Sequence, residues 1–199
     1  VHPLLGARRK SPLKAAQFES FLLPDELAFL NDHRIYGTAL LPATGFIEMA
    51  QAAARALFGA GGTVQDLVIH DALVVGDDGR AVQVIATPDG TGRAALEIYS
   101  QPPDADEWQL QAAATLVDEM ADAPAPVALD TVRARCTATR TAEEHYAHLR
   151  ENGLDFGDSL HGVIDIQWQA GEALGRVQLP DSAAPEASAY HLHPALLDA

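Results

Sequence analysis

The sequence predicts an α+β protein in which an antiparallel sheet wraps a helix, and it predicts that this plan is repeated. Residues 42–58 carry apolar side chains at helical spacing. Four strand-like runs joined by turn-forming residues follow this helix. After a stretch rich in Ala and Pro, a shorter unit of similar order begins at residue 141. Two units of one plan, the second cut short, indicate a duplicated fold with missing sequence.

Two segments precede the helix. Residues 14–23 alternate loosely in polarity and end in a pair of apolar residues, which predicts a strand. Residues 24–41 lack a sustained period and predict a mixed loop, with one helical turn at residues 25–30.

The helix over residues 42–58 has the clearest pattern in the chain. Pro42 suits its first turn, because the missing N–H has no helical partner there, and Gly59 suits its end. We expect one face to be buried against the sheet, namely Phe46, Ala50, Ala53 and Leu57.

The predicted sheet follows the helix. Its four strands are expected over residues 63–75, 81–88, 93–101 and 107–117. The turns between them read GDDG, PDGTG and PPDADE, and each of these is typical of a hairpin.

The Ala-, Pro- and Asp-rich stretch over residues 118–140 predicts a linker. Beyond it, Thr141 is expected to cap a short helix that ends at Gly153. The remaining predicted elements are a hairpin over 163–170 and 173–179, a loop over 181–189 and the start of a helix over 193–199. The chain therefore divides into a first half, a linker and a second half, over residues 1–117, 118–140 and 141–199.

Composition excludes several classes of protein. The 199 residues are 48% hydrophobic, which is enough for the core of one large domain or two small ones. The net charge of −15 repels phosphate backbones and anionic lipid, so nucleic acid and membrane surfaces are poor partners. A carrier protein or partner domain would need a basic patch, and the one dense run is Arg8, Arg9, Lys10 and Lys14.

Cysteine usage and hydropathy bear on the compartment. Cys136 is the single cysteine, which fits a reducing cytoplasm, and the absence of a nearby His disfavours a nucleophilic role. The chain opens without an apolar signal segment. Residues 39–58 are the most apolar stretch, but proline and charged residues interrupt them, so they predict no membrane span. We expect a cytoplasmic protein.

His33 is the first candidate for acid–base chemistry. It lies just before the predicted helix, where free backbone N–H groups create a positive potential. This potential suits an anionic oxygen and disfavours protonated imidazole, so a neutral His33 can accept a proton. From the chemistry alone, a surface-loop histidine with one local hydrogen bond remains the favoured alternative. His145 and His148 share a helix face, but no third ligand at suitable spacing supports a metal site.

Asp198 is the second candidate. Pro194 marks the start of a helix, and Asp198 follows one turn later beside Leu196 and Leu197. Burial among apolar side chains raises the pKa of a carboxyl group, so it can stay protonated and donate to a leaving hydroxyl. Taken alone, a solvent-exposed helix aspartate is the favoured alternative.

The pattern of motifs changes this balance. Residues 33–42, HRIYGTALLP, resemble the HxxxGxxxxP motif of polyketide synthase dehydratase domains. Further stretches resemble the same family in the same order: HPLLG at 2–6, TGFIEMAQAAA at 44–54, YAHL at 146–149, GLDFGDSL at 153–160 and HPALLD at 193–198. The resemblance covers nearly the whole chain.

The resemblance implies a double hot-dog fold, in which each half wraps an antiparallel sheet around a long helix. The active site lies between the halves, with His33 from the first and Asp198 from the second. His33 removes the α-proton of a β-hydroxyacyl thioester, and Asp198 protonates the leaving hydroxyl. Helix N-terminal amides near Pro42 or Gly162 are expected to stabilise the thioester oxygen. The expected substrate-binding residues are Tyr36, Gly37, Pro42, Phe156, Gly157, Leu160 and Gly162.

The resemblance also implies partners. The substrate is expected on the phosphopantetheine arm of an acyl carrier protein, with neighbouring synthase domains as further partners. A homodimer is left open. No metal or nucleotide cofactor is expected.

Three departures from the family pattern keep rival functions open. Phe156 replaces a Tyr, Asp158 replaces a Pro, and residues 108–116 carry Gln and Ala where the family has His and Gly. An enzyme that shifts a double bond or closes a ring needs the same histidine. A non-catalytic docking domain is the rival from another class, although it has no need of both His33 and Asp198.

The apparent truncation carries its own expectation. The long helix and outer strands of the second half are not found before Ala199. Either further sequence completes the second half, or the isolated chain is a poor dehydratase that is prone to aggregate.

Overall fold

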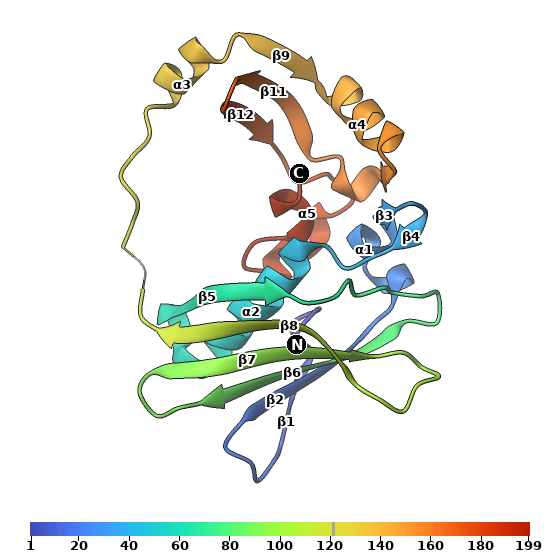
Figure 1. The fold of residues 1–199 in the computed structure, drawn as a ribbon, viewed down its shortest axis with the longest axis vertical. Helices are drawn as coiled ribbons and strands as arrows, with labels where there is room; N and C mark the ends of the chain where they lie inside the picture. Colours follow the sequence, from blue (N-terminus) through green and yellow to red (C-terminus); the bar gives the residue numbers. More distant parts are fainter. Residues whose placement is uncertain (121) are drawn as a thin grey trace.

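A computed structural model describes residues 1–120 and 122–199. Its largest element is a six-stranded antiparallel sheet with the strand order β1-β2-β6-β7-β8-β5 (Figure 1). The strands are β1 (Ala7–Arg9), β2 (Ala16–Leu22), β5 (Gly62–Ile69), β6 (Arg80–Pro88), β7 (Arg93–Gln101) and β8 (Gln109–Asp118). The strands expected at 14–23, 81–88, 93–101 and 107–117 are confirmed to within two or three residues at each end.

Helix α2 (Ala43–Phe58) packs on one face of this sheet and is followed by the short helix η2 (Gly59–Gly61). Phe46, Ala50 and Ala53 are buried in the main core, as expected. The expectation for Leu57 was wrong: it is only partly buried, because it lies in the last turn of α2. The sheet supplies the facing core residues, among them Val82, Val84, Leu96, Ile98 and Leu116.

Strand β5 departs from the expected meander. It ends at Ile69, short of the predicted Val75, and it pairs with β8 at the sheet edge rather than with β6. The GDDG sequence does form a turn, since Gly79 N donates to Gly76 O at 2.9 Å, but this turn does not close a hairpin. Residues 73–75 instead bond to residues 39–41, through Leu41 N to Leu73 O and Val75 N to Ala39 O. An apolar run predicts membership of a sheet but not the neighbouring strand.

The stretch expected as a mixed loop, residues 24–41, contains four short elements. They are η1 (Pro24–Glu26), α1 (Ala28–Asp32), β3 (His33–Ile35) and β4 (Thr38–Ala39). Strand β10 (Leu154–Phe156), from the later part of the chain, pairs with β3 to give a small sheet of order β10-β3-β4. This sheet joins the two regions of the molecule directly.

The later region is smaller and contains a three-stranded sheet of order β12-β11-β9 (Figure 1). Its elements are α3 (Leu129–Arg135), β9 (Ala138–Thr141), α4 (Ala142–Glu151), η3 (Asp158–Leu160), β11 (Val163–Gln169), β12 (Glu172–Val177), η4 (Ala184–Ala189) and α5 (Pro194–Leu197). The hairpin expected over 163–179 is confirmed as β11–β12. The loop expected over 181–189 contains η4.

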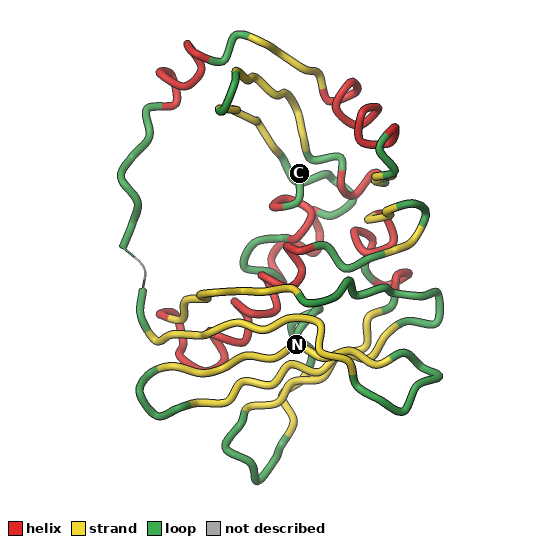
Figure 2. Tube along the Cα trace, in the orientation of Figure 1, coloured by secondary structure: helices red, strands yellow, loops and turns green. Residues whose placement is uncertain are grey.

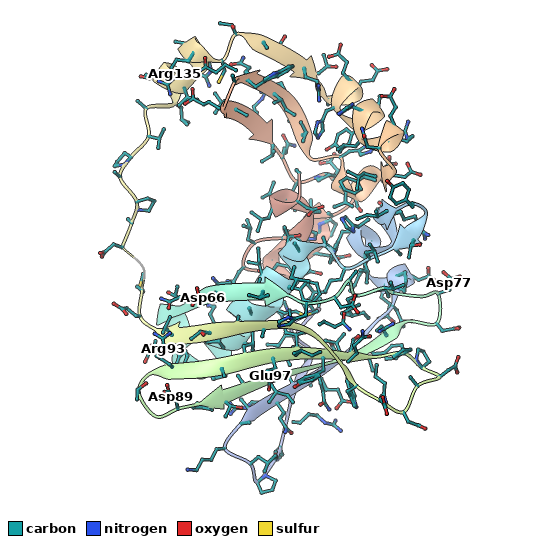
Figure 3. All side chains as sticks on the ribbon, in the orientation of Figure 1. Asp66, Asp77, Asp89, Arg93, Glu97 and Arg135 are labelled. Atoms are coloured by element: carbon teal, nitrogen blue, oxygen red, sulfur yellow. The ribbon has the colours of Figure 1, made fainter. Side chains whose placement is uncertain are left out.

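The stretch expected as a linker is only partly irregular. Residues 122–128 form no helix or strand (Figure 2), whereas α3 occupies residues 129–135 and β9 begins at Ala138. Arg135 of α3 lies far from the large sheet (Figure 3), and its guanidinium pairs with Glu172 of β12. The cap expected at Thr141 is confirmed, since its hydroxyl accepts from Glu144 N at 3.2 Å while Glu144 Oε2 accepts from Thr141 N at 2.9 Å. The half boundaries at 117 and 141 stay predictions. Over the described residues, every helix is too short or too polar to span a bilayer.

Candidate active site

His33 ends α1 and begins β3, so it lies at a strand start and not in the loop expected from the sequence. Strands β3 and β4 are joined by Tyr36 and Gly37 alone, with φ of 48° and 78°. Positive φ at both positions is what a two-residue type I′ hairpin turn requires, and glycine adopts it without strain. The spacing from His33 to Gly37 therefore reverses the chain and brings Leu40 opposite His33.

This hairpin orients the imidazole. Leu40 N donates to His33 O at 3.1 Å, and His33 Nδ1 lies 2.9 Å from Leu40 O. A carbonyl oxygen can only accept, so Nδ1 holds the proton in the neutral ring and Nε2 carries the free lone pair. The side chain is 9% exposed. His33 is therefore held as a base with Nε2 as its reactive atom.

Phe156 covers one face of this imidazole. It lies opposite His33 in the β3–β10 pairing, and the two rings stack with centroids 5.0 Å apart at 29°. The tyrosine expected from the family pattern would place a hydroxyl on this ring, and Phe156 lacks it. The stacking orients the imidazole without adding a polar group.

Asp198 follows the four-residue helix α5 directly and is its C-terminal cap. Its Oδ2 lies 3.6 Å from His33 Nε2, and its side chain is 17% exposed. The two atoms are slightly too far apart for a hydrogen bond, and they are close enough to reach neighbouring atoms of one small molecule. The structure thus brings together the base and acid candidates, which are separated by most of the chain.

Burial controls the protonation of Asp198. It raises the pKa of the carboxyl group above its ordinary value, against the lowering effects of nearby His33 and of the Thr44 hydroxyl. Thr44 lies in the first turn of α2, and its buried Oγ1 has no hydrogen-bond partner of normal geometry among the described side chains. A carboxyl group with a raised pKa keeps its proton to higher pH, as a general acid requires.

A second aspartate ties the two regions together beside His33. Asp32 Oδ2 accepts hydrogen bonds from Ser159 N at 2.9 Å and from Ser159 Oγ at 2.6 Å, and Asp32 O accepts from Gly157 N at 3.0 Å. A Cβ atom at Gly157 would lie 2.3 Å from Asp32 Cγ, so glycine is needed for this close approach. Asp32 thus fixes the residue next to the base against the later region.

Comparisons with known proteins identify the family to which the chain belongs. Models of the polyketide synthase dehydratase domain and of the polyketide synthase dehydratase N-terminal domain match residues 2–101 and 124–199, respectively. The chain belongs to the polyketide synthase dehydratase family. Its fold superposes on the dehydratase domain from the CurK module of the curacin polyketide synthase with a TM-score of 0.92 and 31% identity, covering 100% of this chain and 72% of that one. The expected double hot-dog fold is therefore confirmed.

A further solved structure and two polyketide synthases are also similar to the chain. The dehydratase domain of a mycocerosic acid synthase-like polyketide synthase gives a TM-score of 0.90 at 29% identity, covering 100% of this chain and 70% of that one. Polyketide synthase ThaG of Burkholderia thailandensis is 34% identical over 97% of this chain. Spectinabilin polyketide synthase system protein NorB of Streptomyces orinoci is 33% identical over 99% of it. The chain spans only 4% and 9% of the lengths of these two synthases.

The other expected substrate-binding residues differ in how deeply they are buried. Leu160 is buried, and Pro42 precedes the first turn of α2 near Thr44. Tyr36 is 83% exposed and packs on Gly153, and Gly37 lies in the same outer turn, where its carbonyl accepts from Arg34. These two shape the His33 hairpin from outside, and their expected role in binding substrate stays a prediction.

The expectation that helix N-terminal amides near Gly162 stabilise the thioester oxygen was wrong. Gly162 precedes strand β11, not a helix, so it offers no helix N-terminus for a thioester oxygen. It lies against Ala199 instead, where a Cβ atom would come within 3.0 Å of Ala199 Cβ. Asp158, the residue in place of the family's proline, points into solvent at the start of η3. The remaining helix N-terminus near the pair is that of α2.

Sequence reasoning missed two carboxylates that bind distant partners, the buried Glu48 and the half-buried Asp32. In a sequence, a carboxylate on a helix or beside a histidine has the pattern of a solvent-exposed residue. Its partners are distant in the chain, so the sequence does not reveal them. The clearest available signal was their position, next to the HxxxGxxxxP motif and within the helix that follows it. Among the described residues, no group of three or more His, Cys, Asp or Glu side chains gathers in a way that suits a metal ion.

Proposed function

We propose that this chain removes water from a β-hydroxyacyl thioester, with His33 as general base and Asp198 as general acid. The observation that carries the proposal is the approach of His33 Nε2 to Asp198 Oδ2 at 3.6 Å, with both side chains largely buried. A base and an acid that share one small site can act on adjacent carbons of one substrate. Family membership supports the same reaction.

The proton movements follow from the two environments. His33 Nε2 takes the α-proton, and the C–H electron pair forms the new double bond as the β-hydroxyl leaves. Asp198 gives its proton to that hydroxyl, so water departs. The raised pKa of Asp198 favours the protonated carboxyl group that this step requires. Afterwards, imidazolium faces carboxylate, and a proton passing from His33 to Asp198 restores the starting state.

The charge that develops on the thioester oxygen needs stabilisation. Helix α2 begins directly after Pro42, beside His33 and Asp198. The backbone N–H groups of its first turn have no helical partners and can donate to this oxygen. The buried Thr44 hydroxyl provides a further donor at the same helix end. Phe156 excludes water from one face of His33.

The comparisons support this assignment by analogy. Two solved CurK dehydratase structures are inactive variants, one with an aspartate replaced by asparagine and one with a histidine replaced by phenylalanine. Since the similar curated proteins are polyketide synthases many times longer than this chain, we propose that it works beside neighbouring synthase domains in the cytoplasm. Its substrate would arrive on the phosphopantetheine arm of an acyl carrier protein, without a metal or nucleotide cofactor.

The test is turnover of a β-hydroxyacyl thioester by the complete protein, followed by mass spectrometry. Dehydration lowers the mass of the β-hydroxyacyl thioester by one water molecule. Double-bond migration and ring closure rearrange an enoyl thioester and leave its mass unchanged. We expect His33→Gln and Asp198→Asn each to lower kcat by about 10²–10⁴-fold, the range of general acid–base catalysis.

Matched controls are His148→Gln and Asp158→Asn, which change the same residue types at exposed positions. Both should turn over at the wild-type rate. Wild-type kcat in Asp198→Asn, or conversion without loss of water, would contradict the proposal.

A further inference from the structure

Glu48 is a buried carboxylate with no role in the proton transfers above. It lies in the second turn of α2, one turn after Thr44, and is 2% exposed. Three donors surround it: Oε1 accepts from His2 Nε2 at 2.9 Å and from His191 N at 2.6 Å, and Oε2 accepts from Leu192 N at 3.2 Å. A fully buried carboxylate with this many donors is held rigidly.

The histidine donor is set by its own surroundings. His2 Nδ1 accepts from Leu4 N at 3.2 Å and from Leu5 N at 3.1 Å, so in the neutral ring Nε2 carries the proton that goes to Glu48. Burial alone would raise the pKa of Glu48, but the hydrogen bonds from His2, His191 and Leu192 outweigh it and lower that pKa. Glu48 is therefore ionised at neutral pH. It joins the amino-terminal segment to the segment that precedes α5.

The segment held by Glu48 leads directly to Asp198. His193 follows it and caps α5 by accepting from Ala195 N through Nδ1 at 3.2 Å. Helix α5 has four residues, and Asp198 N donates to Pro194 O at 3.0 Å at its end. A helix this short has little stability of its own. The direction of Asp198 therefore depends on where residues 191–193 are anchored.

Helix α2 acts as the common frame. Its N-terminus lies beside Asp198 through Thr44, and Glu48 holds the approach to α5 one turn later. Aromatic contacts pack the anchored segment, since Tyr190 meets both Phe29 and His193 edge to face. These ring contacts do not fix the position of the segment along α2. The two hydrogen bonds from backbone N–H groups to Glu48 do fix it, because they are directional.

We propose that Glu48 is a positioning residue for Asp198, because its carboxylate fixes residues 191–192 and so aims Asp198 Oδ2 at the site of His33 Nε2. This inference rests on the proposed acid role of Asp198. Glutamine at this position keeps the size of Glu48 but turns an N–H₂ group toward backbone donors, so at least one hydrogen bond is lost and the segment shifts. A shift of about 1 Å in an acid lowers turnover by up to about 10²-fold.

The experiment is a double-mutant cycle in the complete protein, with Glu48→Gln, Asp198→Asn and the combined variant. We expect Glu48→Gln to lower kcat by about 10–100-fold with KM changed less than about threefold. In the Asp198→Asn background, the same change should lower the residual kcat by less than about threefold, because the group it positions is already disabled. Glu172→Gln, which removes a partly exposed hydrogen-bonded carboxylate far from the site, is the matched control and should leave kcat unchanged.

Thermal melting establishes that each variant is folded. If Glu48→Gln fails to fold, Glu48→Asp takes its place in the cycle, since it keeps the charge and shortens the reach by one methylene. Losses that multiply in the double variant, or wild-type kcat in the folded Glu48 variant, would overturn the inference. Wild-type kcat in Asp198→Asn alone would instead overturn the proposed acid, so the two failures are distinguishable.

Discussion

The region up to residue 118 and the region from residue 122 differ in how much apolar surface they bury. The main core consists almost wholly of side chains from the first region, and the second region adds Leu160, Tyr190 and Ala195. Strand β6 places Val82, Val84 and Ala86 inward in strict alternation, whereas every residue of β12 is exposed or half-buried. The first region therefore has a core of its own, and the second is thinly covered over the described residues.

This contrast matters because each region supplies one member of the candidate catalytic pair. His33 lies in the well-packed first region, and Asp198 lies at the end of a four-residue helix in the second region. What joins them is a set of directional contacts between the regions, made by Asp32, Glu48 and the β3–β10 pairing. The geometry of the site thus depends on polar contacts at the junction more than on a core shared by both sides.

The largest expected effect tests the difference in packing. Phe46→Ala should lower the free energy of unfolding by about 3–5 kcal/mol, because this buried ring of α2 leaves a cavity in the main core. Trp168→Ala removes a half-buried ring from β11 and should cost about 1 kcal/mol. Urea unfolding of the 199-residue chain measures both. Equal losses would show that the two regions are packed alike.

The next effect tests the junction. Asp32→Ala removes the acceptor of both Ser159 hydrogen bonds and should lower the free energy of unfolding by about 2–3 kcal/mol, because bonds to a charged group are among the stronger ones. The control is Asp155→Ala on β10, whose exposed pairing with Arg150 is worth about 0–1 kcal/mol. Turnover should fall in Asp32→Ala as well, since the residue beside His33 loses its anchor. An Asp32→Ala variant as stable as Asp155→Ala would mean that the core holds the regions together after all.

The sequence predicted much of the first region, and for a physical reason. Strands β6 and β7 match their expected bounds within a residue, because alternation and turn residues act locally. The Thr141 cap in the second region was predicted for the same local reason. The approach of His33 to Asp198 was also expected, but from family resemblance and not from local pattern.

The features that sequence reasoning missed depend on distant partners. Strand β5 pairs with β8, which is specified by packing on α2 and not by the GDDG turn. Glu48 is buried because His191 and Leu192, more than 140 positions away, donate to it. Helix α3 lies in a stretch whose Ala and Pro content is typical of a linker, and its one buried side chain is Val132. Tertiary contacts decided each case.

The smallest expected effect concerns the free energy of unfolding that is lost because Asp198 is buried in the second region. Burial raises the pKa of Asp198 in the folded protein above its unfolded value, which is about 3.9. The folded state therefore binds more protons than the unfolded state between these two values. Stability contributed by this group is present below the unfolded pKa and is lost as pH rises through the folded pKa. Asp198→Asn removes that loss, so it should stabilise the chain by about 0.5–1 kcal/mol at pH 7 and leave it unchanged near pH 3.

Glu172 provides a control of opposite sign within the same region. Its hydrogen bond from Arg135 lowers its pKa, so its contribution is present above the unfolded pKa and is lost as pH falls through the folded pKa. Glu172→Gln should therefore destabilise the chain at pH 7, and the difference should vanish in acid. Urea unfolding at several pH values gives both curves. If Asp198→Asn and Glu172→Gln shift stability in the same direction, then Asp198 is stabilised as a carboxylate by His33. In that case the candidate site would hold an ion pair, and Asp198 would begin the reaction without the proton that a general acid must donate.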